Sequence, residues 1–199
     1  MVVAVTAKGA AAGKIQLYGC QSNLAALTIQ SGFAMKTQYC KIAKSLPHAM
    51  ASPTSDVKHP TLAEAVHHIN NIDFSSIVEK LCSEDPLLCR KWSATEAEVA
   101  IQYYKNFLFL NKKYLDEFPV IPPMLEVDEI WHHHILDTRQ YINDCNQIFG
   151  YYFHHYPYFG TRNPSDKENL DTAFQLTQKL HEFEFGSKML DIWSEEREL

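Results

Sequence analysis

The chain has 199 residues, enough for one domain with a hydrophobic core, and its hydrophobic fraction of 46% is ordinary for a globular protein. Its formal net charge is −6, so we expect no general affinity for nucleic acid. No apolar run approaches the roughly 20 residues needed to cross a membrane, and we expect no membrane span.

The first 55 residues form a distinct compositional segment. They contain five lysines and no acidic residue, are rich in Ala, Gly, Ser and Thr, and show no long helical period. We therefore interpret residues 1–59 as a poorly specified N-terminal extension, partly disordered, in which 15–19 and 26–34 are candidates for short strands. In a second interpretation the natural start is Met50, and residues 1–49 have no structural role.

Apolar spacing and capping signals predict a helical domain over residues 60–199. Ser93–Glu96 and Ser165–Glu168 match the capping box, Asp73 and Asp137 can each cap a helix, and Gly150 and Gly186 are good helix stops. Strand signals are nearly absent after residue 60, so the predicted class is all-α in a single compact domain. We expect the long helix to pack against residues 125–149 and 166–185. The predicted helices span 61–69, 73–81, 94–115, 125–136, 138–149 and 166–185.

The five cysteines are few, odd in number and widely spaced, and no C-x-x-C pair occurs. This pattern argues against a disulfide framework and against a cysteine-built zinc site, and it favours a reducing, cytoplasmic location.

Histidines concentrate between Glu126 and Gly160, where five of the ten fall within 24 residues. On a helical wheel for residues 125–136, His134 lies within the apolar side and His133 lies opposite it. Asp128 and His132 are four residues apart, so their side chains meet along one edge. We predict that His134 is buried, that His133 faces solvent, and that His132 pairs with Asp128.

This spacing restricts any metal site. Residues two apart on a straight helix point about 200° away from each other, so His132 and His134 cannot ligate one ion. Asp128 and His132 can ligate together, with His154 or His155 completing the set. Two histidines and one carboxylate suit a divalent metal, Zn(II) or non-haem Fe(II), with an open coordination position.

Further residues of the segment are expected to support this site rather than form it. Trp131, His134 and Asp144 are candidates for a second layer that orients the ligands. Three others receive structural roles: Cys145 as a small buried hydrophobe, Asp137 as a helix cap and Tyr141 as part of an apolar face with Ile142.

Other functions remain open at this stage. Asp128 and His132 also fit a hydrogen-bonded pair that locks two helices, or a metal-free acid–base enzyme in which Asp128 orients His132. The aromatic and histidine run 151–159 fits the docking surface of a non-catalytic interaction module for a protein partner. His67 and His68 lie on a short polar-looking helix and are expected at the surface.

Several short motifs resemble the glycine-rich domain-containing protein-like family, over roughly residues 73–160. The resemblance implies a helical domain without an established reaction, in which the motif residues form one structural unit. The chain has only seven glycines and no glycine-rich region, so roles tied to that region do not transfer. The motifs are the segment Tyr104–Leu108, the Pro122-Pro123 pair, and the series Val127, Asp128, Trp131, His132, His134, Tyr141, Asp144, Cys145, Phe149 and Gly150.

Overall fold

The computed structural model describes residues 42, 59–84, 90–118 and 120–193, and every regular element in these ranges is an α-helix. The predicted all-α class is confirmed. Within the same ranges no helix is both long enough and apolar enough to cross a membrane. The candidate strands 15–19 and 26–34 lie outside the described residues. The helices are α3 (Leu62–Asn71), α4 (Ser75–Cys82), α5 (Ala94–Tyr114), α6 (Leu125–Leu136), α7 (Thr138–Ile148) and α8 (Pro164–Phe185).

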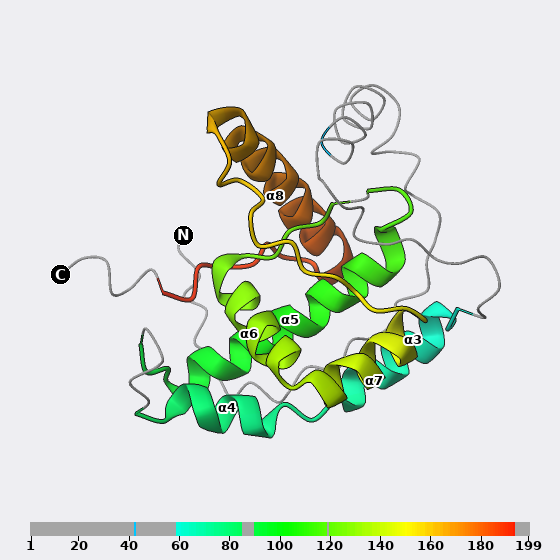
Figure 1. The fold of residues 1–199 in the computed structure, drawn as a ribbon, viewed down its shortest axis with the longest axis vertical. Helices are drawn as coiled ribbons and strands as arrows, with labels where there is room; N and C mark the ends of the chain where they lie inside the picture. The colour runs from blue at the N-terminus through cyan, green and yellow to red at the C-terminus, as the bar shows by residue number, and fades with distance from the viewer. Residues whose placement is uncertain (1–41, 43–58, 85–89, 119, 194–199) are drawn as a thin grey trace, which may run out of the picture.

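Helix α5 is the central element, and α3, α4, α6 and α8 all pack against it (Figure 1). It begins with the predicted capping box, in which Ser93 and Glu96 each bond the other's backbone N–H. All six residues from Asn106 to Asn111 are buried. A helix covered on several sides needs no single apolar stripe, which explains why this segment is apolar around most of its circumference.

The packing of α7 differs from the prediction that the whole of 125–149 packs on the long helix. Helix α7 lies along α3 and also contacts α6 (Figure 1). The chain bends sharply at Asp137, whose side chain caps α7 as predicted by accepting the Gln140 N–H. Because the bend redirects α7 toward α3, Ile142 is 49% exposed instead of lying on the buried face with Tyr141.

Two helix starts also differ from the predicted caps. Helix α8 begins at Pro164, and Asn163 caps it by accepting the Asp166 N–H, so the Ser165–Glu168 box is wrong. Proline suits the first helical position because its missing N–H would have no intrahelical partner there. Before α4, Asp73 accepts the Ser75 N–H, although Phe74 occupies the cap position itself.

The segment after α8 is fixed by side chains rather than by regular structure. Gln178 bonds both the N–H and the carbonyl of Met189. The Glu126 carboxylate, on α6, accepts the N–H groups of Ile192 and Trp193. Burial, together with the nearby Asp191 carboxyl, raises the pKa of Glu126 above its ordinary value. Sequence reasoning missed this role, because Glu126 reads as an ordinary first-turn acid.

Two glycines in the left-handed conformation differ only in their surroundings. Gly150 and Gly186 both have φ of 80°. A Cβ at Gly150 would lie 2.9 Å from His59 Nδ1 and 3.1 Å from Pro60 Cδ, whereas a Cβ at Gly186 would meet nothing within 4 Å. His59 Nδ1 is bonded to the Phe149 carbonyl at 3.1 Å, so displacing this ring would also break a hydrogen bond.

We therefore predict that Gly186→Ala lowers the free energy of unfolding by about 1–2 kcal/mol, the cost of a left-handed alanine. Gly150→Ala should cost about 1–3 kcal/mol more, because overpacking adds to the same backbone strain. Urea unfolding followed by circular dichroism measures both variants. Equal losses would show that the contact between Gly150 and the segment before α3 does not matter for stability.

Candidate metal centre

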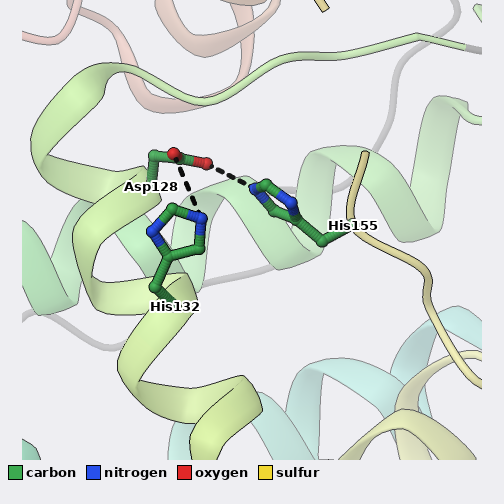
Figure 2. Close-up of side chains that lie close together, drawn as sticks. All are labelled: Asp128, His132 and His155. Carbon is green, nitrogen blue, oxygen red and sulfur yellow. Dashed lines mark hydrogen bonds and ion pairs between the residues drawn. The ribbon is translucent and has the colours of Figure 1, made fainter. Parts of the chain in front are cut away.

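Three of the four predicted ligands converge at one point on the surface of α6 (Figure 2). Asp128 and His132 lie one turn apart on this helix, and His155 reaches them from the segment between α7 and α8. The Asp128 carboxylate is shared: Oδ1 lies 2.9 Å from His155 Nε2, and Oδ2 lies 3.6 Å from His132 Nε2. One potential ligand atom from each residue falls within 4.8 Å of the other two.

A stack of aromatic rings places His155. Phe153 is fully buried, and its ring centroid lies 5.1 Å from that of Trp131 and 4.6 Å from that of Phe149. The Phe153 backbone is held as well, because Tyr141 Oη donates to its carbonyl and its N–H donates to Cys145 Sγ. His155 follows two residues later, and its ring packs edge-on against Trp131 at 4.4 Å between centroids.

Exposure differs among the three residues. The side chains of His155 and Asp128 are 12% and 28% exposed, whereas that of His132 is 46% exposed. The imidazole rings of His132 and His155 lie 4.6 Å apart between centroids. The cluster therefore has two members anchored in the fold and a third at the solvent side.

The other histidines of the segment are placed elsewhere. His154 is exposed, and its ring lies against Tyr152 at 4.8 Å, so the structure does not bring it to the cluster. His133 was predicted to face solvent, which is wrong: its side chain is only 9% exposed and lies 3.4 Å from Glu129. The helical wheel placed His133 on the polar side of α6, but a residue on the polar side of a helix can still be shielded from solvent by neighbouring parts of the protein.

His134 is buried, as predicted, and belongs to a chain of polar side chains that joins four helices. Tyr104 Oη on α5 lies 2.8 Å from His134 Nδ1, and His134 Nε2 lies 3.1 Å from Asp144 Oδ2 on α7. Asp144 Oδ1 lies 2.7 Å from His68 Nε2 on α3. We call these four residues the Asp144 network. No hydrogen bond, ion pair or ring contact joins this network to Asp128, His132 or His155, so neither His134 nor Asp144 bonds a candidate ligand directly.

Of the two histidines expected at the surface, His67 is exposed, whereas the His68 side chain is only 26% exposed and bonded to Asp144, so it lies at the edge of the core. The available signal was its place on the helix, three residues after Ala65 and next to Ile69, at the edge of the buried face.

The electrostatics of the Asp144 network favour a carboxylate. Burial would raise the pKa of Asp144, but hydrogen bonds from His134 and His68 outweigh burial and hold this pKa below its usual value. Burial also raises the pKa of the neighbouring Cys145 thiol to about 11. A buried thiol that stays protonated fits the structural role predicted for Cys145 and not that of a nucleophile.

A pocket of about 260 Å³ opens beside the cluster and contacts Asp128 and His155. Its walls are otherwise apolar or aromatic, and no Lys or Arg of the described chain lines it. No local sequence pattern predicts this pocket, because its wall is assembled from four separate segments. The remaining lining residues are Val120, Pro122, Pro123, Leu125, Trp131, Tyr156, Pro157, Phe159 and Leu170.

The spacing of the three residues is close to that of ligands around a bound ion. Ligand atoms around a tetrahedral ion, each about 2.1 Å from it, are separated by about 3.4 Å. The 2.9 Å separation involves Asp128 Oδ1 and the 3.6 Å separation involves Oδ2, and one ligand atom from each residue lies within 4.8 Å of the other two. Binding an ion would therefore require the three side chains to close around a single point.

The model of the UCP032817-like family matches residues 64–184, more than half of the chain, and the chain belongs to this family. The family is uncharacterised and carries no reaction to transfer. No curated protein and no solved structure shows significant similarity to the chain.

This match overturns the resemblance to the glycine-rich domain-containing protein-like family. The motif residues behind that resemblance lie inside the matched range. In the run Trp131-His132-x-His134, Trp131 packs in the core and His134 belongs to the Asp144 network. Such local structural features do not by themselves identify a family.

We predict that Asp144→Ala lowers the free energy of unfolding by about 3 kcal/mol, because it leaves two histidines without their buried partner. The exposed control His154→Ala should change the free energy of unfolding by less than about 0.5 kcal/mol.

The stability provided by Asp144 should depend on pH. Because the pKa of Asp144 is depressed in the folded protein, its contribution to the free energy of unfolding is present above the unfolded pKa of about 3.9 and is lost as pH falls through the lower folded pKa. Denaturant unfolding between pH 3 and pH 7 measures this, and Asp144→Asn should flatten the acid side of the profile. An unchanged profile in Asp144→Asn would refute the assignment of this carboxylate as ionised.

Proposed function

We propose that this member of the UCP032817-like family binds one divalent metal ion through Asp128, His132 and His155. The observation that carries the proposal is the convergence of two imidazole nitrogens and a carboxylate from two separate parts of the chain (Figure 2), beside a pocket that Asp128 and His155 line. A hydrogen-bonded pair needs only two of these groups. The third makes the set a two-histidine, one-carboxylate ligand arrangement.

The donor types favour Zn(II) or non-haem Fe(II). Both ions accept imidazole nitrogen and carboxylate oxygen, and three protein ligands leave at least one coordination position open. An open position beside a pocket is the arrangement of catalytic rather than structural metal sites, in which the four positions are usually all taken by protein. The proposal is therefore a metal-dependent activity on a small molecule.

A metal-free acid–base function is the second candidate, and the 2.9 Å contact favours it. In the form supported by this contact Asp128 orients His155 rather than His132, because His132 lies farther from the carboxylate and is more exposed. A docking role for the run 151–159 has less support, since Phe153 is committed to the core. Tyr158 is 62% exposed and Tyr152 is 39% exposed, and they are the large hydrophobic residues of the run that remain at the surface.

We predict that the metal-stripped protein takes up one equivalent of Zn²⁺, or of Fe²⁺ without oxygen. His155→Ala and Asp128→Asn should each weaken binding by more than about 100-fold, because even changes in supporting residues around a metal cost about 10–100-fold. Elemental analysis after gel filtration gives the stoichiometry, and titration against a coloured chelator gives the affinity.

Each of the two histidine ligands has a neighbouring histidine that serves as a control. His154→Ala removes an exposed imidazole next to His155, and His133→Ala removes one next to His132. Both controls should bind metal within about twofold of the unchanged protein. No metal uptake, or equal losses in ligand and control variants, would exclude the proposed site and leave the acid–base reading.

A further inference from the structure

The pocket beside the cluster combines two residues of the candidate metal site with a largely apolar wall. Asp128 and His155 are these two residues, and the other described lining residues carry no charge. Leu125, Phe159 and Leu170 come from α6, the segment before α8, and α8 itself. A bound molecule would therefore meet the candidate metal position at one end and carbon surfaces elsewhere.

The net charge of the candidate metal site determines which kind of ligand group can bind there. A divalent ion with one carboxylate and two neutral imidazoles has a net charge of about +1. In a low-dielectric pocket such a charge is best balanced by a single negative charge. A dianion such as a phosphate ester would leave one charge uncompensated, because no Lys or Arg of the described chain lines the pocket.

We infer, on the basis of the metal site proposed above, that this pocket binds a small organic monocarboxylate, whose carboxylate reaches the metal and whose apolar tail lies against Leu125, Phe159 and Leu170. A pocket volume of about 260 Å³ is small for a ligand site, so we expect a short tail, as in an acid of about six carbon atoms.

The test is calorimetric titration of the Zn²⁺-loaded full chain with acetate, butanoate and hexanoate. Affinity should rise about two- to fourfold for each added methylene, the gain expected when a methylene is buried. Hexylamine also has six carbon atoms but carries the opposite charge, and it should not bind. Removing the zinc should weaken hexanoate binding by more than tenfold.

Two exposed leucines of α6 provide matched variants. Leu125 is 63% exposed and lines the pocket, whereas Leu136 is 75% exposed and does not line it. Leu125→Trp should narrow the pocket and weaken hexanoate binding at least tenfold, with zinc stoichiometry and acetate binding unchanged. Leu136→Trp should change neither.

The outcomes separate this inference from the metal site. Normal zinc uptake with no dependence on tail length, or with hexanoate binding unaffected by Leu125→Trp, would overturn the pocket assignment alone. Failure to bind zinc would overturn the metal site and with it the metal-dependent mode of carboxylate binding.

Discussion

The buried Asp144 carboxylate, bonded by two imidazoles, constrains how α3, α5, α6 and α7 pack together. Asp144 is 4% exposed, and such a group is stable as an anion only if its oxygens are bonded. His134 and His68 bond them from α6 and α3, and Tyr104 of α5 bonds the far nitrogen of His134. Because an unpartnered charge in this place is costly, these helices have one relative arrangement that satisfies every member of the network.

The same arrangement fixes which face of α6 meets solvent. With His134 turned inward to Asp144, residues two positions away on the helix must point elsewhere, and His132 lies at the edge together with Asp128. Trp131, which lies between Asp128 and His132 in the sequence, faces the core, and its ring packs against the rings of both Phe153 and His155. The network and the candidate metal cluster are thus separate in space but share one helix, whose orientation serves both.

The case for a functional site at this cluster rests on the third group and the adjacent pocket, and not on the number of histidines nearby. Histidine–carboxylate pairs are common as structural locks, and the His133–Glu129 contact on the same helix is an example without a third group. At Asp128 a third donor arrives from a distant segment, and an apolar cavity with no other charge among its described lining residues opens next to it. In the function proposed above, a metal at this cluster would hold the carboxylate of a small acid, and the apolar wall would contact its tail.

Sequence alone determined the helices, because capping boxes, apolar spacing and glycine stops act over four residues or fewer. Ser93, Asp137 and Gly186 were therefore found, while the start of α8 was misplaced because two caps competed within three residues. The pairing of Asp128 with His132 also followed from helix geometry. Only the tertiary structure decided between His154 and His155, brought His68 to Asp144, covered His133 and built the pocket. Each of these features depends on which segments pack together. That choice is set by the summed burial of side chains that are far apart in the sequence, and a local pattern of a few residues cannot predict it.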